Sequence, residues 1–235
     1  MATKEIFDIN CVQAEALYAR AKAYWEAAPS DNDGMLGGFA HLHKPDITQS
    51  RAFVAQLFKQ GYLKRCEYAL DCGAGIGRVT KDLLLPAFDK VDMVDVVEDL
   101  VLVKSKNYIG PNPKVGERFA CGLQDFDPPA GRYDLIWVQW VTGHLTNADF
   151  VAFFKRCQEG IRQGGLICWK DNIASSSTGE IFDEEDCSWT RTQEQVESLF
   201  EESGLAIVRQ EVQKGFPKGM FKVIMYCLRL KKTEE

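Results

Sequence analysis

Long hydrophobic runs, paired cysteines and a surplus of basic residues are all missing from this chain. No apolar stretch approaches the roughly 18 residues that a membrane span needs, and the polar first ten residues do not resemble a secretory leader. We therefore expect no membrane partner and an intracellular location. The eight cysteines include no Cys-x-x-Cys pair, which argues against a zinc site and against a disulfide framework.

The charge balance and the length narrow the class further. Twenty-eight basic and 34 acidic residues give a formal net charge of −6, which argues against nucleic-acid binding and leaves room for a basic partner. At 235 residues and 46% hydrophobic content, the chain can bury a sizeable core, and no Ser-, Gly- or Pro-rich linker divides it. We predict a monomer with one domain over 1–235, made of a helical extension at 1–66 and an α/β core at 67–235.

The most informative motif is a glycine-rich loop, Asp71-Cys72-Gly73-Ala74-Gly75-Ile76-Gly77-Arg78, which separates a predicted strand from a predicted helix over 79–85. Glycines let the backbone bend sharply and approach a ligand, and the helix start behind them presents unpaired N–H groups. Asp95 follows Gly75 by 20 positions, where nucleotide-binding sheets place a carboxylate for ribose hydroxyls. A glycine loop by itself also fits an ordinary strand-to-helix turn, so the neighbouring segments must decide.

Nicotinamide and S-adenosylmethionine (SAM) sites share these two features, and the next segments favour SAM. The segment Gly122-Leu123-Gln124-Asp125 follows a third apolar run, and its backbone and side-chain amide can bracket an adenine. A fourth run, 133–140, is apolar nearly throughout, as in a strand covered on both faces, and it ends in a polar and aromatic tip. A dehydrogenase is disfavoured because no separate substrate domain follows the nucleotide loop.

The order of the predicted elements favours a doubly wound α/β fold. Apolar residues spaced by three and four predict a first helix that ends before Pro29, and Thr146 with Asp149 predicts a capping box for a later helix. Further strands are predicted at 166–169, 205–212 and 222–230, with a helix at 193–202. The result is a mostly parallel, seven-stranded, Rossmann-like sheet whose last strand runs antiparallel.

Three groups of residues are candidates for chemistry. His144, just past the fourth strand, is placed where an imidazole can reach a substrate, although a structural loop histidine is the alternative. Asn172, after the fifth strand, can both donate and accept a hydrogen bond. The acidic run 183–186 would ordinarily be a solvated loop, but at the cofactor edge of the sheet it can also form a wall for a cationic substrate.

In combination these motifs resemble the protein N-terminal α-N-methyltransferases, which are class I SAM-dependent enzymes. The resemblance implies transfer of methyl groups from SAM, with S-adenosylhomocysteine as product, to the α-amino group of proteins that begin Xaa-Pro-Lys or Xaa-Pro-Arg once the initiator methionine is removed. The similarity extends from about Tyr18 to Leu230 and rests on the segments 33–38, 71–78, 122–125, 137–145 and 170–172.

The same resemblance implies roles for individual residues. The candidate bases are Asp186 and His144, with Asn172 beside them in the catalytic set, and no metal is implied. The cofactor would be held by Gly73, Gly75, Arg78, Asp95, Val96, Val97, Leu123, Gln124 and Gln139. The peptide channel would be lined by Trp25, Leu36, Leu42, Trp140, Asn172, Asp183, Asp186 and Ser188.

The chain departs from the family pattern at two places. Asp186-Cys187-Ser188-Trp189 stands where the family has Asp-Ser-Ser-Val, and Phe221 stands where a tyrosine is expected. Because an α-amino group with a pKa of about 7.7 to 8.0 is largely protonated at neutral pH, a base is required whichever residues supply it. Two other functions stay open, a small-molecule amine N-methyltransferase and a SAM-binding partner subunit without activity. The set of His144, Asn172 and Asp186 argues against the inactive subunit.

Overall fold

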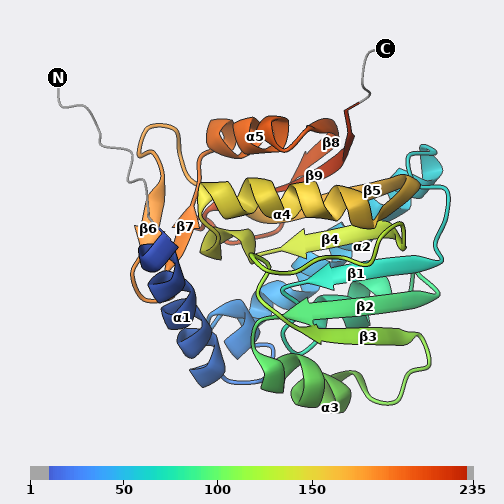
Figure 1. Cartoon of the computed structure of the whole chain (residues 1–235), viewed down its shortest axis with the longest axis horizontal. Coiled ribbons are helices and arrows are strands. Elements are labelled where there is room, and N and C mark those ends of the chain that lie inside the picture. Colours follow the sequence, from blue (N-terminus) through green and yellow to red (C-terminus); the bar gives the residue numbers. More distant parts are fainter. Residues whose placement is uncertain (1–10, 232–235) are drawn as a thin grey trace.

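The computed structural model of the protein describes residues 11–231, and its centre is a single seven-stranded sheet (Figure 1). The strand order is β3-β2-β1-β4-β5-β9-β8, with parallel pairing from β3 through β5 and antiparallel pairing of β9 with both its neighbours. The predicted doubly wound sheet with a reversed last strand is confirmed. The strands are β1 (Tyr68–Cys72), β2 (Lys90–Asp95), β3 (Val115–Ala120), β4 (Tyr133–Gln139), β5 (Ile161–Ile173), β8 (Leu205–Val212) and β9 (Lys222–Leu230).

The strand order reverses between β1 and β4, and this switch point determines where a ligand can bind. β1 pairs with β2 on one side and with β4 on the other, so the chain leaves β3 and returns to the opposite side of β1. A crevice forms outside the carboxyl ends of the two strands at such a switch point. Every residue of β4 is buried, which explains its nearly continuous apolar sequence.

Two hydrophobic clusters cover the two faces of the sheet. One contains Phe150, Phe154 and Phe200 from the helices α4 and α5, and the other contains Phe53 and Leu57 from α2. The helix α2 therefore packs directly on the sheet, although it belongs to the segment that we predicted as an extension. The α-helices are α1 (Cys11–Ala27), α2 (His43–Lys59), α3 (Ser105–Ile109), α4 (Asn147–Gly160) and α5 (Gln193–Glu202).

Short helical turns make up most of the connections between these elements. The helix predicted over 79–85 is present as a π-helix, in which the Leu85 N–H donates to the Thr80 carbonyl five residues earlier, at 2.9 Å. The turns are the 3₁₀-helices η1 (Gly34–Leu36), η2 (Ala40–Leu42) and η5 (Thr142–His144), and the π-helices η3 (Thr80–Leu84) and η4 (Asp99–Lys104).

The cap of α4 joins the first helix to the rest of the molecule. As predicted, the Thr146 hydroxyl accepts from the Asp149 N–H, at 3.1 Å. The other half of the predicted box is supplied by Tyr18 of α1, whose hydroxyl accepts from the Thr146 N–H at 3.2 Å and donates to the Asp149 carboxylate. Burial and the bond to Asp149 raise the pKa of Tyr18 to about 12, so this hydroxyl stays a donor.

The acidic run, for which we predicted a loop or a wall, is part of a small hairpin. Strand β6 (Ile181–Asp183) pairs antiparallel with β7 (Ser188–Thr190), and Figure 1 shows this pair beside α1, at the edge to which β1 and β4 point. Within residues 11–231, no helix is long and apolar enough to cross a bilayer, and no cluster of side chains offers metal ligands.

Candidate active site

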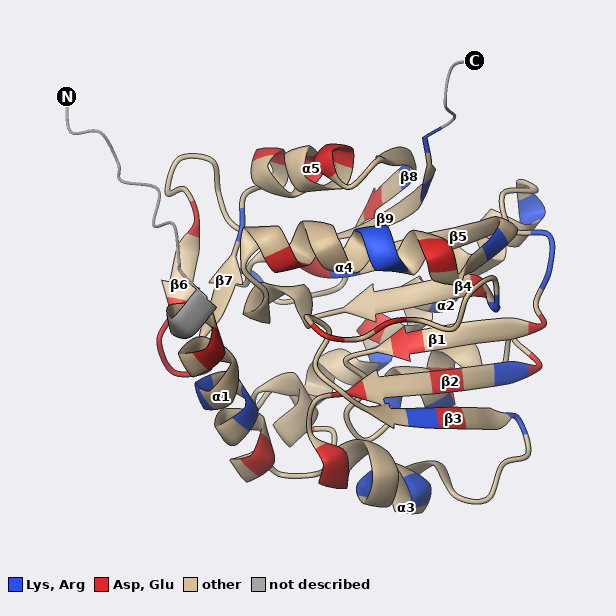
Figure 2. Cartoon of the chain, in the orientation of Figure 1, with Lys and Arg blue, Asp and Glu red and all other residues tan. Residues whose placement is uncertain are grey.

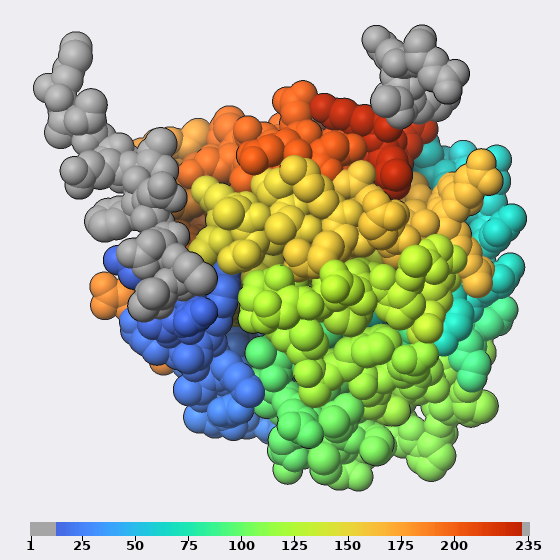
Figure 3. Space-filling model, in the orientation of Figure 1, coloured from blue at the N-terminus to red at the C-terminus, as the bar shows by residue number. Residues whose placement is uncertain are grey.

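A pocket with an empty volume of about 1060 Å³, counted to its open mouth, lies at the carboxyl ends of β1 and β4. The helix α1 forms its roof, and Figure 3 shows the surface of α1, in blue, directly against the green middle of the chain. The lining residues are Tyr18, Ala21, Lys22, Trp25, Met35, Asp71, Gly73, Ala74, Gly75, Arg78, Val79, Asp95, Val96, Leu100, Gly122, Leu123, Gln124, Gln139, Trp140, Val141, His144 and Leu145.

The floor of the pocket is the backbone of the glycine loop. Gly73 has a φ of +69°, and a Cβ there would lie 2.6 Å from the Val141 side chain, so only glycine fits. The N–H groups of Gly73 and Ala74 both donate to the Val94 carbonyl, at 2.9 and 3.0 Å, which holds the loop against the end of β2. The loop backbone is therefore held at the floor of the pocket with no side chain at Gly73.

Asp95 closes the loop from the other side. Its two oxygens accept from the Gly75 N–H at 2.8 Å and from the Val97 N–H at 2.9 Å. Burial raises the pKa of this carboxyl, and the two backbone bonds lower it. Each oxygen keeps a further lone pair for a hydroxyl. Val96 lines the pocket, whereas the Val97 side chain packs inward beside Leu100, so Val97 contributes to the site through its backbone alone.

Two further pocket residues, Arg78 and Gln139, rest on a buried carboxylate that the sequence did not point out. Arg78 donates from Nη1 to the Asp46 carboxylate at 2.6 Å, and Gln139 donates to it from Nε2 at 2.9 Å. Lys170, which is fully buried, also contacts Asp46. Burial raises the pKa of Asp46, but the charges of Lys170 and Arg78 outweigh burial and place the pKa below its usual value.

These donors and acceptors fit the parts of SAM. Asp95 offers acceptors for ribose hydroxyls, Leu123 and Gln124 form the wall expected for adenine, and Arg78 offers a cation for a carboxylate. Because Gly73 has no side chain, a ligand can approach the backbone of the glycine loop closely at this position.

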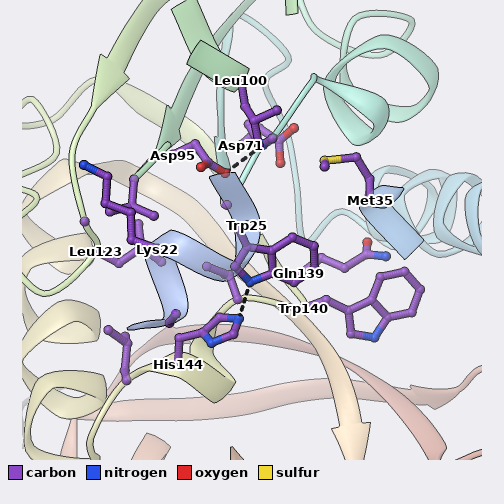
Figure 4. A pocket seen from close by; sticks show the side chains of 18 of the residues that line it. Lys22, Trp25, Met35, Asp71, Asp95, Leu100, Leu123, Gln139, Trp140 and His144 are labelled. Atoms are coloured by element: carbon purple, nitrogen blue, oxygen red, sulfur yellow. Dashed lines mark hydrogen bonds between the residues drawn. The ribbon is translucent and has the colours of Figure 1, made fainter. Parts of the chain in front are cut away.

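On the roof, a hydrogen bond joins the first helix to the loop after β4 (Figure 4). Trp25 donates from Nε1 to the Nε2 atom of His144 at 3.0 Å. Since an indole only donates, Nε2 must carry a lone pair, and the neutral imidazole has its proton on Nδ1. Burial lowers the pKa of His144, while the charge of Asp186 and the backbone at Cys187 and Asp186 oppose this shift.

Three buried polar atoms around this roof have no hydrogen-bond partner in the described part of the chain. They are the Trp140 Nε1, the His144 Nδ1 and an oxygen of Asp186. A buried polar group without a partner costs free energy unless water or a ligand meets it, so a polar ligand at this roof would gain by bonding to these three atoms. Trp140 also has a φ of +51°, a strained conformation for a bulky residue.

The remaining residues predicted for the peptide channel lie outside the pocket lining. Leu36 and Leu42 are buried in η1 and η2, and Asn172 is half-buried at the end of β5. Asp183 is exposed on β6, and Ser188 is half-buried at the start of β7, next to the loop that carries His144. The structure thus unites Trp25, Trp140 and His144 in one cavity and leaves the other predicted channel residues outside its lining.

A seven-stranded sheet of this order with a nucleotide pocket at its switch point defines the class I SAM-dependent methyltransferases, and this protein is one of that class. More narrowly, the chain belongs to the family described as AdoMet dependent proline di-methyltransferase, which it matches over residues 13–229.

Similar proteins agree with this membership. The chain is 51% identical over 219 residues to the Alpha N-terminal protein methyltransferase 1 of Caenorhabditis elegans, covering 93% of both chains. It is 47% identical over 214 residues to the N-terminal Xaa-Pro-Lys N-methyltransferase 1 of Bos taurus, covering 90% of this chain and 95% of the relative. A SAM-dependent methyltransferase structure from Leishmania major superposes with a TM-score of 0.85 at 36% identity, over 91% of this chain and 83% of the other.

Proposed function

We propose that this protein uses SAM to methylate the α-amino group of protein N-termini that begin Xaa-Pro-Lys or Xaa-Pro-Arg, after removal of the initiator methionine. The observation that carries the proposal is the set of three unpaired buried polar atoms, on Trp140, His144 and Asp186, beside a pocket suited to SAM. The names of the relatives from Caenorhabditis elegans and Bos taurus support the choice of substrate. The partner would be a basic peptide segment rather than a nucleic acid, met by a monomer in the cytoplasm and nucleus.

SAM supplies an electrophilic methyl group, and the protein must hold the cofactor so that this group faces the amine. Eight predicted residues line the pocket and would make direct contacts, and Val97 would act by fixing the Asp95 carboxylate. Orientation of the two reacting groups supplies much of the rate enhancement in such a transfer. The eight residues are Gly73, Gly75, Arg78, Asp95, Val96, Leu123, Gln124 and Gln139.

The amine must lose its proton before it can attack, and we assign this step to Asp186. Its unpaired oxygen is buried at the tip of the β6–β7 hairpin, where it interacts with His144. His144 has its Nε2 atom occupied by Trp25 and its Nδ1 atom protonated, so it donates to the substrate or to Asp186 while Trp25 stays in place. It becomes a base only when the Trp25 bond opens.

Asn172 would orient the peptide rather than move a proton. The Asp171 carboxylate accepts from the Asn172 N–H at 2.8 Å, which fixes the backbone near the end of β5, where Asn172 pairs with Val223 of β9. The Asn172 amide can then both donate to and accept from a peptide backbone. An amide has no useful basicity, so its loss should weaken peptide binding more than it changes the pH dependence of the reaction.

The outer part of the site is suited to a cation. Figure 2 shows the acidic turn between β6 and β7 beside α1, and the Arg20 side chain joins the two by donating to the Glu184 carbonyl at 3.0 Å. The pKa of Tyr24 in α1 is raised by burial and also by the charges of Glu185, Asp186 and Asp183, so the negative field reaches the roof. A lysine or arginine in the third position of the substrate would lie in this field.

Trp25 and Trp140 complete the recognition of the first two substrate residues. Their rings can face a methylated ammonium, an attraction of roughly 0.5 to 2 kcal/mol. A proline in the second position has its φ angle fixed, so an apolar aromatic wall can select it at little cost in entropy.

Mass spectrometry of a Ser-Pro-Lys-Arg peptide incubated with the protein and SAM tests the proposal. We expect mass gains of whole methyl groups on the free peptide and none on a peptide whose α-amino group is acetylated, since acetylation removes the nucleophile. A Ser-Ala-Lys-Arg peptide is the matched control for proline. Turnover on free small amines with none on any of these peptides would contradict the proposal and favour a small-molecule methyltransferase. Tight SAM binding without any turnover would favour an inactive partner subunit.

A further inference from the structure

Behind the cofactor pocket lies a closed cluster of charged and polar side chains centred on Asp46 of α2. The Asp46 side chain is 0% exposed and accepts from Arg78, Gln139 and Lys170. Two of these partners, Arg78 and Gln139, line the pocket, whereas Asp46 and Lys170 do not. Asp46 is therefore one layer behind the residues that meet the cofactor.

The cluster fixes which way the Gln139 amide points. The Trp137 indole only donates, and it meets the Gln139 oxygen at 2.9 Å. The Asp46 carboxylate only accepts, and it meets the Gln139 nitrogen at 2.9 Å. An amide held between an obligate donor and an obligate acceptor has one orientation, and it presents its second N–H and the free side of its oxygen to the pocket.

Arg78 is held in the same way. Its Nη1 atom donates to Asp46 at 2.6 Å and lies 3.4 Å from the Nδ1 atom of His43. No other hydrogen bond of its guanidinium is formed within the described residues, and its carbon lies 5.5 Å from the centre of the Trp140 ring. The rest of the guanidinium fork is thus available to a ligand in the pocket that Arg78 lines.

Lys170 makes the cluster positively charged without being a reactive amine. Its three donors are taken by Asp46, by the Ser50 hydroxyl at 2.9 Å and by the Gln213 oxygen at 2.6 Å. An ammonium with every donor satisfied cannot serve as a base for the substrate. The cluster holds two basic side chains and one acidic one, and Arg78 carries its positive charge to the pocket wall, where it favours a carboxylate.

We propose that Asp46 is a positioning residue for the amino-acid end of the cofactor. It aims Arg78 and Gln139 at the carboxylate of SAM, and Lys170 preserves the net positive charge that this carboxylate meets. The hydrogen bonds and ion pairs that Asp46 forms with the described residues do not include Asp95, Leu123 or Gln124, which form the adenosine wall. Its loss should therefore affect binding of the amino-acid end and spare binding of the nucleoside.

Calorimetry with two ligands separates this role from a purely structural one. S-adenosylhomocysteine carries both ends of the cofactor, whereas 5′-methylthioadenosine lacks the amino acid. In Asp46→Asn, one donor to the carboxylate is left facing an amide N–H, and we expect S-adenosylhomocysteine to bind about tenfold or more weakly. Binding of 5′-methylthioadenosine should not change.

A matched control and a second variant keep the test decisive. Asp92→Asn alters another fully buried aspartate, paired with Arg132 at 2.9 Å but outside the pocket, and it should bind both ligands as the parent does. Asp46→Glu is the second variant, because it retains the charge that pairs with Arg78 and Lys170 while its extra methylene should misplace Arg78 and Gln139. If the folded variants keep the parent ratio of the affinities for S-adenosylhomocysteine and 5′-methylthioadenosine, the proposal is wrong.

Discussion

The two sides of this active site are built in opposite ways. On the cofactor side, each polar group of Asp95 and Gln139 already has a protein partner before any ligand is present. On the substrate side, Trp140, His144 and Asp186 each keep a buried polar atom without a partner among the described residues. The first side is pre-organised and the second is incomplete until a ligand arrives.

This difference has a physical consequence for what each side can select. A wall whose polar side chains are held by protein partners presents its remaining donors and acceptors in fixed directions, and it gains affinity because little has to be ordered on binding. A wall with unpaired buried groups stores a cost that only a ligand of the right polarity removes, and that is a strong source of specificity. We therefore expect changes on the substrate side to alter turnover and changes on the cofactor side to alter affinity.

The largest effect should come from Asp186. Asp186→Asn removes the proposed base, and loss of a general base typically lowers kcat by about 100- to 10,000-fold. SAM affinity should stay the same, because Asp186 does not line the cofactor pocket. Steady-state kinetics and calorimetry measure the two quantities. Asp183→Asn is the control, an exposed acid on the same hairpin whose loss should lower kcat only slightly.

A change in the glycine loop should act on affinity instead. In Gly73→Ala, the new Cβ meets Val141 at 2.6 Å and the φ of +69° becomes strained, so the backbone must shift where it approaches the cofactor. We expect SAM binding to weaken by about tenfold or more. Gly131→Ala has a similar φ of +58° with open space around it, so it should lower stability without touching affinity. Equal SAM affinity in both variants would contradict the assignment of the glycine loop to the cofactor site.

The acidic hairpin should give a smaller, salt-dependent effect. Replacing the third substrate residue from Lys to Ala should lower kcat/KM by no more than about fivefold, because a pair with the exposed Asp183 is worth at most about 1 kcal/mol. Replacement by Glu should be worse than Ala, since like charges then meet near Asp186. Added salt should reduce the difference between the Lys and Ala peptides. Equal kcat/KM for all three peptides would make the hairpin a solvated turn.

The smallest effect should be the pH dependence of stability, to which both sides of the site contribute in the same direction. Burial raises the pKa of Asp71, under the cofactor loop, and of Asp171, under the substrate edge, to about 7. The folded state thus prefers both carboxyls protonated, and this stabilisation is complete below the unfolded pKa and is lost as pH rises towards 7. We expect Tm to fall by several degrees between pH 5 and pH 8.

Single variants divide that pH dependence between the two sides. Asp71→Asn and Asp171→Asn each remove one titrating carboxyl, so each should show a shallower fall in Tm over the same range, measured by differential scanning fluorimetry. An unchanged slope in either variant would show that the carboxyl is ionised in the folded protein. If the pH dependence of Tm changes in only one of the two variants, then only that carboxyl is protonated in the folded protein, and the two sides of the site differ in their buried acids as well.

The same contrast explains how far the sequence predicts this protein. The cofactor side is built from local motifs, since Gly73, Asp95 and Leu123 follow successive strands and each motif can be recognised without knowing the fold. Strands β8 and β9 were predicted to the residue because their apolar runs end at clear turns. β5 was predicted at 166–169 and extends over Ile161–Ile173. Its first residues are polar or glycine, so no apolar run marks its start, and pairing with β9 extends its other end to Ile173.

Two of the features that the sequence did not predict are contacts between distant residues, and the third is a short hairpin. Asp46 and Lys170 are 124 positions apart, and nothing near either residue shows that a buried ion pair connects them. The bond from Trp25 to His144 spans 119 positions. The hairpin β6–β7 has strands of three residues, and β6 is exposed throughout, so no alternation of apolar and polar residues marks it. The pattern of apolar and polar residues in the sequence predicts helices and strands, whereas contacts between distant polar side chains are seen only in the structure.

The roof over the pocket is contributed by a part of the chain that comes before the second methionine, Met35. A polypeptide started or trimmed at that point would keep every strand of the sheet, together with Asp46, the glycine loop and Asp95. It would lack Tyr18, Lys22 and Trp25, and so the bond from Thr146 to Tyr18 at the start of α4, the cover of the pocket and the partner of His144. Such a short form would keep the floor of the pocket and lose its cover, so the carboxyl ends of β1 and β4 would be open to solvent.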